Sequence, residues 1–278
     1  AHQAGAATVL VNGRISDRSY PGYLRIRPFF ERFLQEIDRF LMQSETYAER
    51  IRKMGARASS IEVVGSLKFD SDGASSSPRP RVTPAGRPIV VAGSTLDPEE
   101  RILLSVFERL RSDVSGLFLV IAPRQAPRFD AVFELASSRG FRVARRSLVT
   151  LPAGAESADV LILDTLGELA SVYAEADVAF VGGSLASWGG HNIIEPASWG
   201  KPVLFGPHMQ NFIDVARIFL EAGAALQVND ETELESALRD LLLRPERRDE
   251  LSRRALAVVA SNRGAASRTT GVLEELLS

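Results

Sequence analysis

The residues that could do chemistry gather in one short stretch, Gly182 to Pro196, which reads GGSLASWGGHNIIEP. It follows an apolar run, Val178 to Val181, of the kind that forms a buried parallel strand. Paired glycines let the backbone come close to a ligand, and a strand-to-helix turn presents backbone amides to a phosphate or a sugar. We therefore predict a ligand site here, although the pair Gly182 and Gly183 alone is equally compatible with a simple tight turn.

The polar side chains of this stretch each allow two interpretations. Glu195 follows Asn192 by three positions, so it could complete a capping box around an asparagine cap or accept hydrogen bonds from a ribose diol. His191 is interpreted as a hydrogen-bonded turn residue rather than a base; with Glu195 one turn later it would form only an incomplete metal pair. Trp188 and Trp199 are expected to pack or to act as a lid.

These side chains have to be positioned by strands and helices, and the chain alternates the two from Pro88 onward. Apolar strands are expected at 88–92, 117–122, 141–144, 160–163, 178–181, 202–205 and 224–228, with helices between them and after the last. Near-continuous apolar strands without polar alternation indicate a parallel sheet covered on both faces. The sequence therefore predicts an α/β fold with a Rossmann-like domain in this part of the chain.

Polar residues recur directly after the expected strands. They are Ser94, Thr95, Arg124, Gln125, Asp164, Thr165, Ser184, His191, Asn192, Glu195, His208, Gln210 and Asn211. Open α/β sheets bind ligands at the carboxyl ends of their strands, so we expect these loops to border one cleft. Arg124 is compatible with a surface ion pair or with a fork for a phosphate or carboxylate.

The part of the chain before Pro88 is less complete. Strands are expected at 7–11, 40–43 and 61–64, a mostly helical segment at 16–40, and a further helix capped by Ser44 and ended by Gly55. The Ser- and Pro-rich stretch from Asp70 to Arg87 has no periodicity and is typical of a linker. Because a doubly wound domain normally needs about five or six strands, we predict that the chain begins within a domain. A small independent cap is the alternative.

Composition narrows the classes of function. The net charge of -2 gives no overall basic bias, which argues against nucleic-acid binding, so local sites must carry any anion recognition. The chain has no cysteine, which excludes disulfides, thiolate nucleophiles and cysteine-ligated metals. An arginine run at Arg14, Arg18, Arg25 and Arg27 fits a solvated face, or a surface for an anionic acceptor or a membrane.

Several segments resemble the bacterial 3-deoxy-D-manno-octulosonic acid (Kdo) transferases, which move Kdo from CMP-Kdo to the lipid A precursor in lipopolysaccharide synthesis. The segments are VNGRISDRS (Val11–Ser19), GSLKFD (Gly65–Asp70), APR (Ala122–Arg124), DTLGEL (Asp164–Leu169), and FVGGSL with GGHNIIEPASWGKPVLFGPHMQNF (within Phe180–Phe212). The resemblance is collinear from Val11 to about Val228, and its last motif is long and specific.

The resemblance implies the type B glycosyltransferase fold, with two facing Rossmann-like domains. It implies a partial N-terminal acceptor domain over 1–70, a linker over 71–87, a complete C-terminal CMP-Kdo domain over 88–262, and a last helix over 263–278 that packs back on the N-terminal domain. Transfer is expected to be inverting and to need no metal and no cofactor. The partners implied are CMP-Kdo, the lipid A precursor and the cytoplasmic face of the bacterial inner membrane, where the full-length protein is anchored.

Carried over position by position, the resemblance also implies site residues. The donor-binding set is Ser94, Thr95, Arg124, Gly182, Gly183, Ser184, Gly190, His191, Asn192 and Glu195, and the acceptor-side or interdomain set is Arg14, Ser16 and Arg18. Because CMP is the leaving group, charge grows on a phosphate, and backbone amides, a helix N-terminus and an arginine stabilise such charge.

Two departures from the family pattern set expectations about activity. The family usually has a histidine where this chain has Gln125, and its membrane-anchoring segment and glycine-adjacent catalytic glutamate have no counterpart before Ala1. We therefore expect these 278 residues to keep the donor site and to lack the catalytic base. A nucleotide-sugar 2-epimerase of the same architecture, which would favour a uridine nucleotide, and a noncatalytic nucleotide-binding module are the alternatives.

Overall fold

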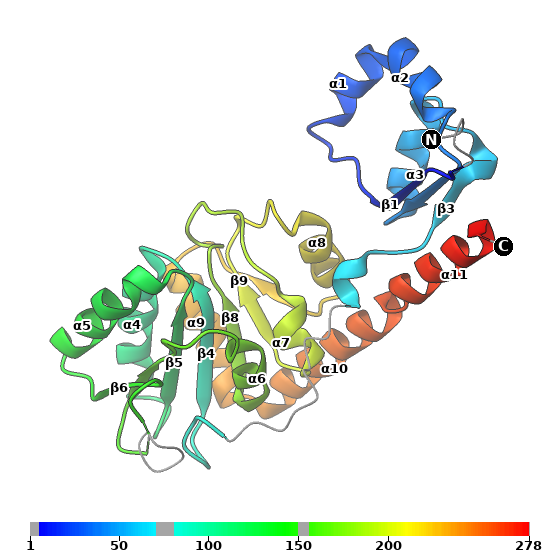
Figure 1. Cartoon of the computed structure of the whole chain (residues 1–278). Coiled ribbons are helices and arrows are strands. Elements are labelled where there is room, and N and C mark those ends of the chain that lie inside the picture. The colour runs from blue at the N-terminus through cyan, green and yellow to red at the C-terminus, as the bar shows by residue number, and fades with distance from the viewer. Residues whose placement is uncertain (1–5, 71–80, 150–155, 278) are drawn as a thin grey trace. The chain divides into compact units, whose positions relative to one another are not determined.

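The computed structural model describes residues 6–70, 81–149 and 156–277, and it divides into two compact units (Figure 1). The large unit is Gly73–Val259, and the small unit is Ala1–Asp72 together with Ala260–Ser278. No helix in the described ranges is both long enough and apolar enough to cross a membrane.

The described part of the large unit is built on one parallel sheet of seven strands, in the order β10-β9-β8-β4-β5-β7-β6. The strands are β4 (Ile89–Thr95), β5 (Phe118–Pro123), β6 (Val143–Arg145), β7 (Val160–Ile162), β8 (Val178–Val181), β9 (Val203–Phe205) and β10 (Leu226–Gln227). The chain leaves β4 toward β5 on one side and later places β8 on the other side of β4. This reversal is the switch point of a doubly wound sheet, and the α/β Rossmann-like prediction is confirmed.

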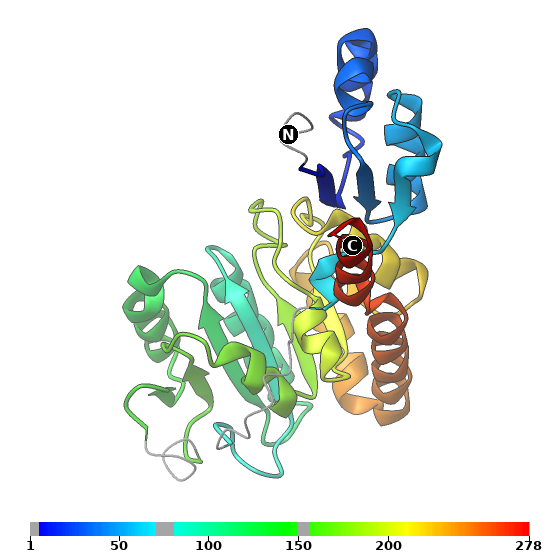
Figure 2. The same ribbon diagram turned by 45° about the vertical axis from the view of Figure 1, so that its right-hand side comes forward.

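Helices cover both faces of this sheet (Figures 1 and 2). They are α4 (Glu99–Leu110), α5 (Phe129–Ser138), α6 (Leu169–Val172), α7 (Ile194–Ser198), α8 (Ile213–Glu221), α9 (Glu231–Leu243) and α10 (Pro245–Asn262), with the short 3-10 helices η4 (Ala126–Arg128) and η6 (Tyr173–Glu175). Along β4, Val90 and Ala92 pack with α4, α5 and α9, whereas Ile89 and Val91 pack with α6 and η6. Since both faces of each central strand are buried, the strands read as continuous apolar runs.

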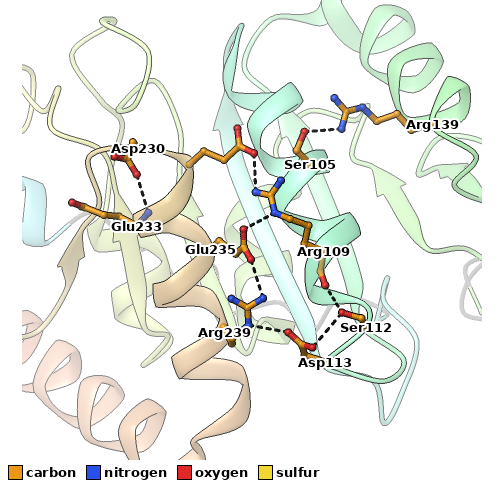
Figure 3. A network of polar contacts seen from close by, with 10 residues as sticks. Ser105, Arg109, Ser112, Asp113, Arg139, Asp230, Glu233, Glu235 and Arg239 are labelled. Carbon is orange, nitrogen blue, oxygen red and sulfur yellow. Dashed lines mark hydrogen bonds and ion pairs between the residues drawn. The ribbon is translucent and has the colours of Figure 1, made fainter.

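Charged side chains tie α4 to α9 across the outer surface, as Figure 3 shows. The guanidinium of Arg109 donates to Glu231 Oε1 at 2.7 Å and to Glu235 Oε2 at 2.5 Å. Arg239 joins Glu235 to Asp113 at the end of α4, with N–O distances of 2.8 and 2.9 Å. These ion pairs join two helices that also pack through apolar side chains in the core of the large unit.

The described part of the small unit holds a parallel three-stranded sheet in the order β1-β2-β3. Its elements are β1 (Val9–Gly13), α1 (Tyr20–Arg25), α2 (Arg27–Leu34), β2 (Arg39–Met42), α3 (Glu45–Lys53), η2 (Ala58–Ser60), β3 (Ile61–Val63), η3 (Leu67–Phe69) and α11 (Ala265–Leu277). The C-terminal helix α11 belongs to this unit: Val272 packs on Leu41 and Val64, and the Asp70 carboxylate accepts the Gly264 and Ala266 amides at 2.6 and 2.5 Å.

Local sequence signals explain where most of these elements begin and end. The Ser44 hydroxyl accepts the Tyr47 amide at 3.4 Å, which confirms the predicted cap of α3. The single helical segment predicted over 16–40 is instead two helices that meet at Ile26, because Pro28 has no N–H to continue the first one. The linker prediction falls mostly on residues 71–80, which lie outside the described residues.

Candidate functional site

A pocket of about 330 Å³ opens at the carboxyl ends of β4, β5 and β8, at the switch point of the large sheet. Its lining comes from the loops after these strands and from helices on either side, and consists of Ser94, Arg124, Tyr173, Val181, His191, Asn192, Glu195 and Phe212. Open α/β sheets place ligands at this position, so the pocket is the candidate site.

The end of β4 is shaped to present Ser94 to the pocket. The register with β5 shifts between Gly93 and Thr95, and Ser94 takes a left-handed conformation with φ of 55°. Such a bulge re-aims a side chain at the end of a strand. Gly93 is required by close packing, because a Cβ there would lie 1.9 Å from the hydroxyl of Tyr173.

The turn into α7 holds Asn192 and Glu195 together. Asn192 Oδ1 accepts the Ile194 amide at 3.1 Å, and Asn192 Nδ2 donates to Glu195 Oε1 at 3.3 Å. This is not the reciprocal capping box, in which the glutamate would accept the backbone amide of the cap. Because only one described hydrogen bond to Glu195 exists, its carboxylate keeps most of its capacity to accept bonds from a ligand.

Burial and the Arg124 charge set the protonation states in the pocket. Burial raises the pKa of Glu195 above its ordinary value, while the Asn192 bond and the Arg124 charge act in the opposite direction. Burial, followed by the Arg124 charge, lowers the pKa of His191, and its buried Nε2 has no hydrogen-bond partner among the described residues. Burial, followed by Glu195, raises the pKa of Tyr173. His191 and Tyr173 are therefore neutral at pH 7, beside the guanidinium of Arg124 and the carboxyl group of Glu195.

Arg124 is exposed and stands at the exit of β5. Its backbone amide donates to Thr95 O at 2.9 Å, which fixes the start of the loop. Within the part of the chain that the structure describes, its guanidinium makes no ion pair, so the surface-ion-pair interpretation is not supported. A guanidinium without a carboxylate partner can bind a phosphate or carboxylate of a ligand.

The structure brings together half of the predicted donor residues: Ser94, Arg124, His191, Asn192 and Glu195 all line the pocket. Thr95, Gly182, Gly183, Ser184 and Gly190 do not. The Thr95 hydroxyl donates to buried Glu100 at 3.1 Å, and the Gly190 amide donates to Gly183 O at 2.8 Å.

The two amides expected to cradle a phosphate are also already used. The Gly183 and Ser184 amides donate to the carboxylate of Glu99 at 2.7 and 2.9 Å. This corrects the prediction that Gly183 and Ser184 hold the donor phosphate through their amides, because a phosphate would have to displace a buried carboxylate to reach them.

Sequence reasoning missed three residues of the lining and one behind it. Tyr173, Val181 and Phe212 lie within elements or at their ends rather than among the polar strand-end residues, so neither their types nor their positions mark them as site residues. Glu99 stands in the first turn of α4, where a glutamate usually complements the helix dipole from an exposed position, whereas here it is completely buried. The sequence feature that accompanies its burial is the adjacent pair Glu99 and Glu100 before an apolar helix face.

The predicted acceptor-side residues lie in the small unit, in the loop after β1. Arg14 and Arg18 are exposed, and the hydroxyl of Ser16 lies 2.7 Å from that of Ser19. Arg50 holds the loop by donating to Ile15 O at 2.6 Å and by pairing with Asp17. No group of three or more histidines, aspartates and glutamates in the described ranges is arranged to hold a metal ion.

A family model and several curated relatives that match this chain are 3-deoxy-D-manno-octulosonic acid transferases. Residues 1–71 match the family model described as 3-deoxy-D-manno-octulosonic-acid transferase (kdotransferase). The chain is 37% identical to the 3-deoxy-D-manno-octulosonic acid transferase of Bordetella pertussis and 32% identical to that of Haemophilus influenzae, over 100% and 97% of this chain. It spans 65% and 64% of the length of these two relatives.

Two solved structures are similar to this chain, one over part of the chain and one over the whole chain. The C-terminal CMP-Kdo binding domain of WaaA from Acinetobacter baumannii is 32% identical, with a TM-score of 0.59 over 63% of this chain and 90% of that domain. A putative UDP-N-acetylglucosamine 2-epimerase from Listeria monocytogenes covers 100% of this chain and 68% of its own, with a TM-score of 0.60 and 15% identity. The second likeness shows the two-domain fold alone.

Proposed function

The chain belongs to the 3-deoxy-D-manno-octulosonic acid (Kdo) transferase family, and from this premise we propose that its large unit binds CMP-Kdo in the pocket at the ends of β4, β5 and β8. The bound Kdo is the group that the whole protein transfers to the lipid A precursor. The observation that carries the proposal is the pairing, in one pocket, of an ion-pair-free Arg124 with a half-buried Glu195.

Arg124 is assigned to the phosphate of the donor. In the transfer, a hydroxyl oxygen of the acceptor attacks the anomeric carbon of Kdo while the bond from that carbon to the phosphate oxygen breaks. CMP leaves with the bonding electron pair, and the hydroxyl proton passes to a base. Negative charge therefore grows on the phosphate, where a guanidinium stabilises it more in the transition state than in the ground state.

Glu195 and Asn192 are assigned to the nucleoside. The Glu195 carboxylate, anchored by Asn192 at 3.3 Å, accepts hydrogen bonds from the ribose hydroxyls, as acidic residues do in nucleotide-binding folds. Phe212, which lines the pocket, supplies an aromatic face for the cytosine ring. Neutral His191 adds no charge that would compete with Arg124 for the phosphate.

Calorimetry with CMP, cytidine and UDP tests the donor assignment. We expect CMP to bind more tightly than either of the others, and Arg124→Ala to weaken CMP by about 10- to 100-fold while leaving cytidine unchanged, since a bond to a charged group contributes about 1.5–3 kcal/mol. Gln125→Ala, the neighbouring exposed residue outside the pocket, is the matched control. Tighter binding of UDP than of CMP would favour a uridine-nucleotide enzyme such as a 2-epimerase and would contradict the proposal.

Inversion at the anomeric carbon and independence from metals stay part of the proposal. A transfer assay with full-length protein should keep its rate in excess EDTA, and the product should have the opposite anomeric configuration to CMP-Kdo. CMP binding without any transfer by the full-length protein would instead support a noncatalytic module. The prediction that these 278 residues lack the catalytic base is tested in the same assay, since transfer of Kdo by this polypeptide would refute it.

The membrane surface is proposed as a partner of the small unit. On α1 and α2, Ile26, Phe29 and Phe33 are 49%, 80% and 62% exposed, and Arg25, Arg27 and Arg32 stand among them. Apolar side chains interleaved with arginines suit the interface of a bilayer with anionic headgroups, as on the cytoplasmic face of a bacterial inner membrane. The exposed Arg14 and Arg18 with Ser16, in the loop leading into α1, are assigned to the anionic acceptor lipid.

Vesicle sedimentation tests this surface. The chain should bind vesicles containing phosphatidylglycerol and release them at high salt, and replacing Phe29 and Phe33 by serine should abolish binding without lowering the melting temperature, because both rings are exposed. Unchanged vesicle binding by the double variant would rule out this face.

A further inference from the structure

A carboxylate without solvent exposure sits behind the pocket, inside the glycine-rich turn. Glu99, at the first position of α4, is 0% exposed. Among the described residues it accepts bonds from five backbone amides: Leu96 at 3.0 Å, Gly183 at 2.7 Å, Ser184 at 2.9 Å, Leu185 at 2.9 Å and Ala186 at 3.2 Å. Four of these amides are consecutive, so one carboxylate organises the whole turn after β8.

A run of consecutive amides pointing at one spot is a concavity for an anion, and in many nucleotide-binding proteins a ligand phosphate fills it. Here the anion is covalently part of the chain. Burial raises the pKa of Glu99, whereas the amide hydrogen bonds favour its charged form. The backbone around the carboxylate leaves little room: a Cβ on Gly182 would lie 2.8 Å from Glu99 Oε2 and 2.6 Å from Ser94 O.

The same turn is bonded to the segments that carry the pocket. The Gly183 carbonyl accepts the Gly190 amide at 2.8 Å, directly before His191 and Asn192. The Ser184 hydroxyl accepts the Gly206 amide at 2.8 Å, and the Ser184 carbonyl accepts the His208 amide at 2.9 Å. A change in the backbone conformation of the turn would therefore displace the residues that are assigned to binding the donor.

We propose that Glu99 is a positioning residue for the donor pocket: its carboxylate takes the place of a ligand anion in the turn and holds the chain that presents His191 and Asn192 before the donor arrives. The inference rests on the proposed function, because the pocket is assigned to CMP-Kdo there. It adds that the loop amides are filled internally, so Arg124 rather than the glycine pair receives the donor phosphate.

Glu99→Gln tests the role with a minimal change of shape. Its amide group would set two N–H donors against backbone donors, so the turn must open. Glu100→Gln is the matched control, since Glu100 is also 0% exposed but pairs with Arg128 at 3.1 Å and with Thr95 instead of the turn. We expect Glu99→Gln to weaken CMP by about 10-fold or more and Glu100→Gln by less than about 3-fold, with melting temperatures recorded for both. Equal CMP affinity of the two variants would overturn the proposal.

Hydrogen exchange of the wild-type chain tests whether Glu99 organises the turn, and it does not depend on the folding of any variant. If Glu99 organises the turn, the amides of Gly183 to Ala186 exchange as slowly without CMP as those of β8, and CMP adds little protection. Fast exchange that becomes slow only with CMP would show that the ligand orders the turn, and would refute the role of Glu99. If the wild type does not bind CMP at all, the proposed function fails, and the exchange rates still decide whether Glu99 orders the turn.

Discussion

Replacing Gly93 by alanine should displace Tyr173, a side chain that lines the candidate pocket. The added Cβ would lie 1.9 Å from the hydroxyl oxygen of Tyr173, 2.7 Å from its Cζ and 3.0 Å from Leu169 Cδ1. Contacts this short are not tolerated, and Tyr173 is 1% exposed and packed against α6 and the sheet, so it has little freedom to move away. The side chain that has to shift is one that lines the pocket.

The expected cost follows from overpacking in a buried core. Inserting a methyl group into a filled site costs about 1–3 kcal/mol, which lowers the melting temperature of a domain of this size by about 3–10 °C. Because Tyr173 is forced toward the pocket, CMP affinity should fall together with stability. Tyr173→Phe removes the oxygen that makes the shortest contact, so the double variant should recover part of both losses.

Thermal unfolding and CMP calorimetry on the two single variants and the double variant form a double-mutant cycle. The matched control is Gly271→Ala in α11, where a Cβ would meet nothing within 4 Å and alanine should raise stability by about 0.5–1 kcal/mol. Additive effects at Gly93 and Tyr173, or a Gly93→Ala variant as stable as the wild type, would refute the packing described here.

Three further predictions concern charged groups. Arg109→Ala should lower the free energy of unfolding by about 0.5–1 kcal/mol, because its partners Glu231 and Glu235 are only partly exposed. In 1 M NaCl the loss should be smaller, because salt screens the charges. Arg101→Ala, which removes a more exposed ion pair with Asp97, is the control and should have no measurable effect. Hydrogen bonds from Arg142 hold the pKa of Asp159 below its ordinary value, so the ionised Asp159 stabilises the folded chain. This contribution to the free energy of unfolding is complete above about pH 4 and is lost as the pH falls through the lowered pKa. Urea unfolding between pH 6 and pH 2 should therefore depend less on pH for Asp159→Asn than for the wild type. Burial raises the pKa of Glu195, so CMP affinity should fall as the pH is lowered through that raised pKa, and calorimetry of Glu195→Gln should give weak binding at every pH.

The sequence predicted the strands well because their physical signal is simple. Phe118 to Pro123 and Val178 to Val181 are buried along their whole length, so an apolar run marks each strand almost to the residue. The rule that ligands bind beyond the carboxyl ends of strands then located Ser94 and Arg124 without any structure. Periodicity could not place the break at Ile26, because α1 has no buried residue and α2 buries only Leu34, so neither helix has a buried apolar face that would mark its end.

The sequence did not predict which group within the protein accepts the hydrogen bonds of the backbone amides in the glycine-rich turn. Gly183 and Ser184 have the residue types of a phosphate-binding turn, and nothing local distinguishes a turn that awaits a ligand from one already satisfied by a side chain. The group that accepts these amides, Glu99, is 84 residues from Gly183 in the chain and belongs to helix α4. The two meet because α4 follows β4, and β4 pairs with β8, the strand that leads into the turn.

The two glutamates behind and within the site differ in how far their oxygens are satisfied, and this difference assigns their roles. Glu99 accepts five described backbone amides, which uses the acceptor capacity of its carboxylate and leaves it nothing to offer a ligand. Glu195 accepts one described bond, from Asn192, and lies in the field of Arg124. A ligand that satisfies both Glu195 and Arg124 must carry hydroxyl donors and an anion on one small frame. A nucleoside monophosphate meets that requirement, whereas a free sugar or inorganic phosphate meets only half of it.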